Sequence, residues 1–245
     1  MVVGYPEAVR KGDATIGLAM TSKGNVACVF DAYGTLFNVH SAVAKHANSL
    51  GKGAAEISNL WRAKQLEYSW VHSLMRRHVD FWELTHRALD YALALHRVSD
   101  DQLKRALMES YLALDAYEEV PSVLRRLREA DIKTAILSNG SPFMLQHAMK
   151  SAGISDLIDK CLSIEEARVY KPDPAAYQIA TSALKLQSPG EACFFSSNAW
   201  DIAGAHTFGF SAFWVNRSNQ PEEYGLHQNV QRLSSLSDAI ELVVS

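Results

Sequence analysis

The stretch that decides the fold is Val26-Ala27-Cys28-Val29-Phe30-Asp31-Ala32-Tyr33-Gly34-Thr35-Leu36. Its first five residues form a continuous apolar run, which is typical of a strand buried on both faces of a parallel sheet. The run ends at Asp31, and Gly34 follows within a tight turn. The stretch therefore predicts a buried strand that presents a carboxylate at its carboxyl end.

Similar units recur at residues 132–137, 161–164, 192–195 and 212–215, and they indicate four more strands of the same sheet. Helical patterns lie between them, and this alternation predicts a doubly wound α/β fold with a parallel sheet. Ligands of such folds bind beyond the carboxyl ends of the strands. We therefore expect one site that contains the residues at three of these ends, Asp31, Ser138, Asn139, Ser196 and Asn198.

The first two predicted strands are separated by about 80 residues, too many for one crossover helix. Three apolar stripes with helical spacing fill this insertion, from Ile57 to Met75, from Phe81 to Leu95 and from Leu103 to Leu114. They predict a helical cap of three or four packed helices at residues 39–116. The α/β core then comprises residues 25–38 and 117–245, and residues 1–24 form an N-terminal extension outside the fold.

The composition indicates a globular protein with a small-molecule partner. Hydrophobic residues make up 48% and charged residues 21% of the 245 residues, well away from the composition of disordered chains. The chain has 24 Lys and Arg against 27 Asp and Glu, with no long basic block, which excludes the charge pattern of a nucleic-acid binder. Apolar stretches are too short for a signal peptide or a membrane span, and the three cysteines lack a CxxC spacing. We expect a cytoplasmic protein that binds neither nucleic acid nor membranes.

The carboxylate of Asp31 has two interpretations. A carboxylate held on a tight turn after a buried strand can act as a nucleophile. Alternatively, Asp31 caps a turn and Thr35 caps a helix. The polar residues at the other strand ends favour the nucleophile.

Other candidate residues have structural alternatives too. Ser138-Asn139-Gly140 is also an ordinary turn sequence. Asn198, with an acid at Asp201, resembles a capping box at a helix start. Lys171 precedes a proline, which favours an extended backbone and hence a loop position; most loop lysines are solvated.

The chain resembles the haloacid dehalogenase superfamily over about residues 26–243, in the order and spacing of its shared elements: Asp31 with Thr35, Ser138 with Asn139, Lys171, and Asp201. Most members of that superfamily are magnesium-dependent phosphatases. Their pattern has a second Asp two residues after the nucleophile, where this chain has Tyr33, and an acidic pair in the last motif, where this chain keeps only Asp201. Magnesium requires compensating negative charge from oxygen ligands, and a phosphoester leaving group requires a proton donor. We therefore expect no metal and no cofactor.

Within the superfamily, the chain resembles the L-specific 2-haloacid dehalogenases. The resemblance is carried by Leu60-Trp61-Arg62, Lys64-Gln65-Leu66-Glu67-Tyr68, Val169-Tyr170-Lys171-Pro172-Asp173 and Ser196-Ser197-Asn198-Ala199-Trp200-Asp201. It departs from many relatives at Asn38 and Ala63, which affects the pocket's shape and not the reaction. The implied catalytic residues are Asp31, Thr35, Arg62, Ser138, Lys171, Tyr177, Ser196, Asn198 and Asp201. The implied substrate-binding residues are Ala32, Tyr33, Arg62, Leu66, Phe81, Ser138, Asn139 and Trp200.

The resemblance implies a role for each group. Asp31 would displace halide from C2 of a short L-2-haloalkanoic acid, and Asp201 would help a water to hydrolyse the ester to a D-2-hydroxy acid. Arg62, Asn139 and Trp200 would hold the halide, and Ser138 the substrate carboxylate. A homodimer is implied as well. The rivals are a magnesium phosphatase and a catalytically silent binding protein of the same fold.

Overall fold

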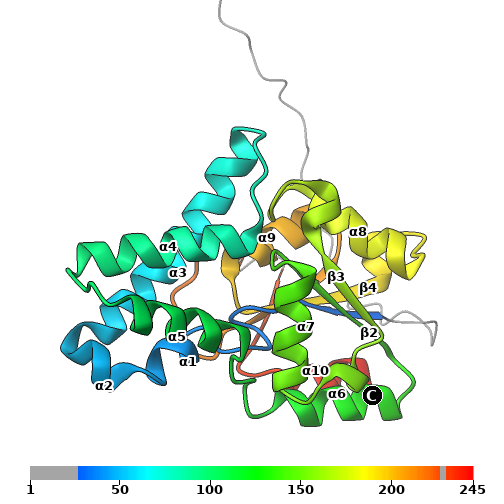
Figure 1. Ribbon diagram of the computed structural model, residues 1–245. Helices are drawn as coiled ribbons and strands as arrows, with labels where there is room; N and C mark the ends of the chain where they lie inside the picture. The colour runs from blue at the N-terminus through cyan, green and yellow to red at the C-terminus, as the bar shows by residue number, and fades with distance from the viewer. Residues whose placement is uncertain (1–26, 227–229, 245) are drawn as a thin grey trace, which may run out of the picture.

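One parallel sheet forms the centre of the molecule within residues 27–226 and 230–244, which are the residues that the computed structural model describes. Its strand order is β3-β2-β1-β4-β5-β6 (Figure 1). The strands are β1 (Ala27–Phe30), β2 (Lys133–Ser138), β3 (Lys160–Ser163), β4 (Ala192–Ser196), β5 (Ser211–Val215) and β6 (Gln231–Leu233). The doubly wound α/β core is thereby confirmed.

Helices cover both faces of the sheet, with α6, α7 and α10 on one side and α8 and α9 on the other (Figure 1). Their bounds are α6 (Val120–Glu129), α7 (Pro142–Ser151), α8 (Pro174–Leu184), α9 (Ala199–Phe208) and α10 (Ser237–Val243). Short 3-10 helices lie at Gly51–Gly53, Ser155–Leu157, Ile164–Ala167 and Pro189–Glu191. The strand order reverses its direction between β1 and β4, and this switch point is where such sheets bind ligands.

The five predicted strands are present, and each of their ends lies within one residue of the predicted end. β2 runs from Lys133 to Ser138 where residues 132–137 were expected, and β3 from Lys160 to Ser163 where 161–164 were expected. β6 was not predicted, because two of its three residues, Gln231 and Arg232, are polar and form no apolar run. The predicted N-terminal extension at residues 1–24 lies outside the described residues.

The insertion after β1 is helical, as predicted from its apolar stripes. It contains α1 (Ser41–Ala44), α2 (Ala47–Leu50), α3 (Ala54–Leu74), α4 (Phe81–Leu95) and α5 (Asp101–Leu112). Asp80 and Asp100 begin α4 and α5, because each side chain accepts hydrogen bonds from two backbone N–H groups of the first turn. The first two predicted apolar stripes extend further than the buried faces of α3 and α4, because Met75, beyond the end of α3, and Leu95, at the end of α4, are exposed.

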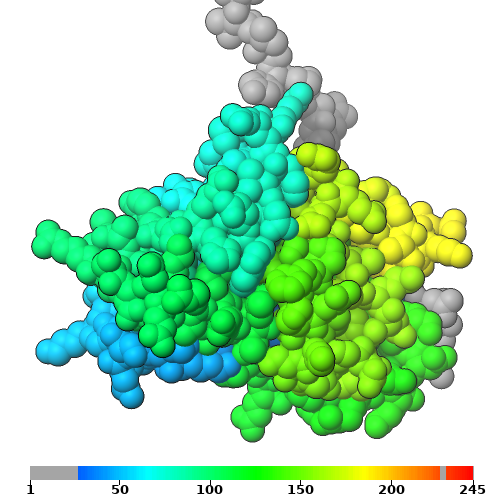
Figure 2. Space-filling view, viewed as in Figure 1, coloured from blue at the N-terminus to red at the C-terminus, as the bar shows by residue number. Residues whose placement is uncertain are grey.

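The cap packs directly on the core. Figure 2 shows the cyan and green helices of the cap in continuous contact with the yellow-green part of the core. Trp82 of α4 meets Phe143 of α7 edge to face, with ring centroids 6.1 Å apart. The indole N–H of Trp70 donates to the backbone carbonyl of Lys171 at 3.1 Å.

In the described part of the chain, no helix combines the length and apolar character that crossing a membrane requires.

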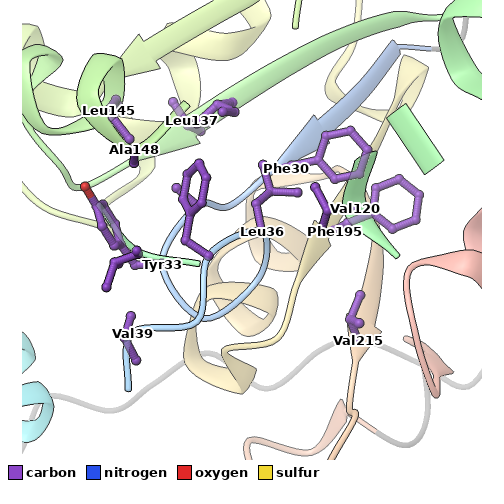
Figure 3. Close-up of a cluster of buried hydrophobic side chains, with 14 of the residues drawn as sticks. Phe30, Tyr33, Leu36, Val39, Val120, Leu137, Leu145, Ala148, Phe195 and Val215 are labelled. Carbon is purple, nitrogen blue, oxygen red and sulfur yellow. The ribbon is translucent and has the colours of Figure 1, made fainter. Parts of the chain in front are cut away.

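The core beneath the site is aromatic and tightly packed. The rings of Phe30 and Phe195 stack at 5.2 Å where β1 and β4 pair, and both are labelled in Figure 3. Figure 3 also shows the Tyr33 hydroxyl on the side of Leu145 and Ala148 of α7. Gly140 makes room for that ring, because a Cβ at position 140 would lie 2.6 Å from the Cε2 atom of Tyr33. The core thus holds the ends of β1 and β2 firmly in place.

Candidate active site

Asp31 is held in a rigid loop at the carboxyl end of β1. Its backbone N–H continues the ladder by donating to the carbonyl of Phe195 at 2.9 Å. The N–H groups of the next turn fold back onto the carbonyl of Ala32. Gly34 has a φ of +94°, a conformation that side chains other than glycine rarely adopt. The loop therefore fixes the direction of the Asp31 carboxylate.

The two carboxylate oxygens of Asp31 have different surroundings. Oδ2 accepts from Thr35 Oγ1 at 2.9 Å and from Asn198 Nδ2 at 2.8 Å, and Ser196 Oγ lies at 3.4 Å. Oδ1 accepts from Lys171 Nζ at 3.3 Å. Every one of these partners donates a hydrogen bond to the carboxylate. Oδ1 is the less engaged oxygen and retains lone pairs for chemistry.

A second carboxylate lies behind the lysine. Lys171 is fully buried, and its Nζ donates to Asp201 Oδ2 at 2.9 Å. The hydroxyl of Tyr177 donates to Asp201 Oδ1 at 2.8 Å. Burial raises the pKa of Asp201 to about 6, although the Lys171 charge opposes this. Burial also raises the pKa of Tyr177 well above its usual range, so this hydroxyl remains a donor.

A small cavity lies between the cap and the strand ends. It is lined by Asp31, Tyr33, Arg62, Leu66, Phe81, Ser138, Asn139 and Trp200. All of the predicted substrate-binding residues except Ala32 lie on this wall. Of the predicted catalytic residues, Asp31, Arg62 and Ser138 line the cavity. The others form hydrogen bonds with Asp31, as Thr35, Lys171, Ser196 and Asn198 do, or lie one contact further away, as Asp201 and Tyr177 do. The lining combines apolar rings with one carboxylate, one guanidinium and two small polar side chains.

Arg62 brings a positive charge from α3 into this cavity. Its Nη1 donates to Gln65 Oε1 at 2.9 Å, and its Nη2 donates to the backbone carbonyl of Tyr33 at 3.1 Å. Asn198 Oδ1 lies 3.4 Å from Nη2. These acceptors are neutral oxygens, so none of them offsets the positive charge of the guanidinium.

Ser138 and Asn139 end β2 beside the nucleophile loop. Ser138 Oγ accepts from the N–H of Gly140 at 3.1 Å, which is the local bond expected of an ordinary turn. Asn139 Oδ1 accepts from the N–H of Lys171 at 3.0 Å. The turn interpretation is therefore confirmed, and the same turn also carries two cavity-lining side chains.

The capping-box interpretation of Asn198 is wrong. Asn198 stands at the N-cap position of α9, but its side chain accepts no hydrogen bond from the helix. Its amide nitrogen donates instead to Asp31 and, at 3.1 Å, to the carbonyl of Tyr33. The carboxylate of Asp201 turns to Lys171 and Tyr177. The side chains at this helix start therefore serve the site.

Arg217 is one of the site residues that the sequence analysis missed. It donates to Ser197 Oγ at 2.8 Å and to the carbonyl of Thr35 at 2.9 Å, and it pairs with Glu119 at 2.7 Å. Its place directly after β5 was a usable signal, because the other strand ends supply site residues. Gln65 lies within one of the strings that carry the resemblance, but neither it nor Trp70 has a strand-end position that would mark it, since each is one polar or aromatic residue within a helix.

The residues present do not fit a magnesium ion. The side chains directed at Asp31 are an ammonium, an amide nitrogen and hydroxyls that donate to it. Asp201 is occupied by Lys171 and Tyr177. Hard cations require several oxygen ligands with compensating negative charge. Within residues 27–226 and 230–244, no group of three or more His, Cys, Asp or Glu side chains has the arrangement of a metal site.

Comparison with known proteins shows extensive similarity to one family. A model of the haloacid dehalogenase-like hydrolases matches residues 26–209. The (S)-2-haloacid dehalogenase 1 of Pseudomonas sp. (strain CBS-3) is 47% identical over 89% of this chain and 96% of its own. A crystal structure of a dehalogenase matches with a TM-score of 0.88 at 44% identity, covering 92% of this chain and 100% of that one. The L-2-haloacid dehalogenase of Xanthobacter autotrophicus, with chloropropionic acid covalently bound, matches with a TM-score of 0.83 at 34% identity, covering 90% and 98%.

Proposed function

Because the chain belongs to the haloacid dehalogenase-like hydrolase family, we propose that it hydrolyses short L-2-haloalkanoic acids to D-2-hydroxyalkanoic acids through an ester of Asp31. The observation that carries the proposal is the Asp31 carboxylate, which lines a small, partly apolar cavity together with the Arg62 guanidinium. The (S)-2-haloacid dehalogenases that resemble this chain support the substrate class.

The first step is displacement at C2 of the substrate. Asp31 Oδ1 donates an electron pair to C2 from the side opposite the halogen, and the carbon–halogen bond breaks with its electron pair leaving on the halide. Thr35 and Asn198 hold Oδ2, so they orient Oδ1 toward the cavity. Back-side attack inverts C2, so an L substrate gives a D product after hydrolysis of the ester.

The departing halide carries a full negative charge that a fixed guanidinium stabilises as it develops. Arg62 supplies this guanidinium, and Asn139 and Trp200 complete the proposed halide site on the same cavity wall. Ser138 is the proposed contact of the substrate carboxylate. Leu66 and Phe81 give an apolar wall for a short alkyl group.

The second step is hydrolysis of the ester at the carbonyl carbon of Asp31. A water adds to this carbon while Asp201 takes one of its protons, and the acyl carbon–oxygen bond then breaks. The product oxygen takes up that proton, and Asp31 ionises by releasing the other proton of the water. Asp201 is the proposed base because it remains ionised after Asp31 is esterified. Both its oxygens accept hydrogen bonds, so the water must displace one donor.

Halide release from (S)-2-chloropropionate tests the proposal. The wild type should release chloride without added magnesium, and Asp31→Asn should lose at least about 1,000-fold in kcat, because an amide is a poor nucleophile. Magnesium-dependent hydrolysis of p-nitrophenyl phosphate, with no chloride release, would instead support a phosphatase. Binding of 2-chloropropionate without either reaction would support a silent binding protein.

The setting of the protein is part of the proposal. Cys28, Cys161 and Cys193 are all free thiols, which supports a reducing compartment such as the cytoplasm. The homodimer stays a prediction from the resemblance. Light scattering of the full chain would test it, with a mass of about 54 kDa expected against 27.1 kDa for one chain.

A further inference from the structure

We infer that Gln65 is a positioning residue for Arg62, whose neutral amide oxygen fixes the guanidinium without cancelling its charge. The charge then remains available to an anion in the cavity. The inference rests on the proposed function only in taking Arg62 as the group that meets the departing halide.

Gln65 lies at the centre of a buried polar network in the cap. Its side chain is fully buried on the inner face of α3. Oε1 accepts from Arg62 Nη1 at 2.9 Å, and Nε2 donates to Thr85 Oγ1 of α4 at 2.7 Å. The hydroxyl of Tyr111 on α5 lies 3.0 Å from Nε2 and 3.1 Å from Oε1. Three helices of the cap therefore converge on one amide.

The neighbours leave this amide only one orientation. The hydroxyl of Thr85 donates its single proton to the carbonyl of Phe81 at 2.7 Å, so toward Gln65 it can only accept. Arg62 can only donate. The nitrogen of the amide must therefore face Thr85 and its oxygen must face Arg62. Burial of a polar group is costly unless its hydrogen bonds are made, and here they are made in only this way.

The charge on Arg62 explains why an amide suits this position. Its acceptors are Gln65, the Tyr33 carbonyl and Asn198, and its side chain belongs to none of the ion pairs found among residues 27–226 and 230–244. A half-buried guanidinium with neutral partners attracts an anion strongly, since the cavity screens it less than water does. A carboxylate at position 65 would accept the same bond and cancel that attraction.

The test is bromide binding measured by quenching of tryptophan fluorescence, without substrate, in the wild type and in three variants. Gln65→Glu should weaken bromide binding at least about tenfold, because it places a negative charge beside Arg62. Gln65→Met removes the acceptor and keeps the guanidinium charged, so bromide affinity should stay within about threefold. Asn59→Asp makes the same amide-to-acid change at an exposed position of α3 and should leave bromide affinity unchanged.

Turnover of (S)-2-chloropropionate gives the second readout. Gln65→Met should lower kcat at least about tenfold with a small change in KM. A charged Arg62 that is not held in place can still follow a bound bromide ion, but it is no longer preorganised for the charge that develops on the departing halide. Far-UV circular dichroism confirms that each variant is folded, and the Gln65→Met result stands even where Gln65→Glu does not fold. Equal bromide affinity in Gln65→Glu and wild type, or an unchanged kcat in Gln65→Met, would overturn the inference. A wild type that binds bromide with this pattern but releases no chloride would refute the proposed function and leave the inference standing.

Discussion

Gly204 of α9 is a position where helix propensity and packing make opposite predictions for alanine. Replacing glycine by alanine inside a helix usually stabilises it by about 1 kcal/mol. At position 204, however, the added Cβ would lie 2.4 Å from the hydroxyl oxygen of Tyr177 and 2.6 Å from Cβ of Pro172. Both neighbours adjoin the Lys171 and Asp201 pair. The sign of the effect therefore depends on how much the clash costs.

The clash outweighs the propensity. Overpacking of a tight interior costs about 1–3 kcal/mol. If Tyr177 moves away, Asp201 loses a buried hydrogen bond, which costs a further 1–3 kcal/mol or so. After subtraction of the helix gain, Gly204→Ala should destabilise the protein by about 3 kcal/mol, which lowers the Tm of a chain of this size by about 6–12 °C. Turnover should fall as well, because Asp201 loses its fixed position.

Differential scanning calorimetry and chloride release measure these two effects. Gly190→Ala is the matched control: its Cβ would meet only the carbonyl oxygen of Gly209, at 3.8 Å. This control should be neutral or stabilise by up to about 1 kcal/mol, because alanine restricts the unfolded chain. A Gly204→Ala protein that melts at or above the wild-type temperature, with normal turnover, would refute the packing argument.

The polar cluster around the nucleophile makes four more outcomes measurable. The kcat should fall as the pH drops through about 6, because burial raises the pKa of Asp201 to about 6 and the ionised form of Asp201 is needed. Tyr177→Phe removes a hydrogen bond that lowers this pKa, so it should shift the acid limb of the kcat profile to higher pH. An unshifted limb would contradict the assignment of Asp201 as the base. The contribution of Asp201 to unfolding free energy has the opposite sign, decreasing as the pH rises from about 4 to 6, because the native state holds the proton more tightly; urea titrations against pH check this. Asn198→Asp should lower kcat about 100-fold or more in the chloride assay, since a donor 2.8 Å from Asp31 becomes a like charge, and near-normal turnover would exclude this role. Arg217→Lys should lower kcat about tenfold with little change in KM, because the fork that joins two site loops is lost; steady-state kinetics decide, with a KM effect alone contradicting it.

The sequence predicted the core and the position of Asp31 well because both depend on local patterns. A continuous apolar run before Asp31 has few interpretations other than a buried strand, and parallel strands place their carboxyl ends at one edge. Ser138, Asn139 and Asn198 could therefore be placed beside Asp31 from the sequence alone. The short edge strand β6 was missed because Gln231 and Arg232 break the pattern on which such predictions depend.

The contacts that join distant segments could not be predicted in the same way. Gln65 meets Thr85 and Tyr111 only after three helices have packed, and no spacing in the sequence records that packing. The direction of the Asn198 side chain is a similar case, because a cap and a contact to Asp31 use the same position at the start of α9. Such choices are settled by tertiary packing and not by local propensity.

A single turnover in heavy-oxygen water tests the central claim most directly. With enzyme in excess over (S)-2-chloropropionate, the first hydroxy acid released should carry no heavy oxygen, because its new oxygen comes from Asp31. Mass spectrometry of the peptide that contains Asp31 should then show the label in this side chain. Label found at once in the hydroxy acid, with none in Asp31, would contradict the ester intermediate.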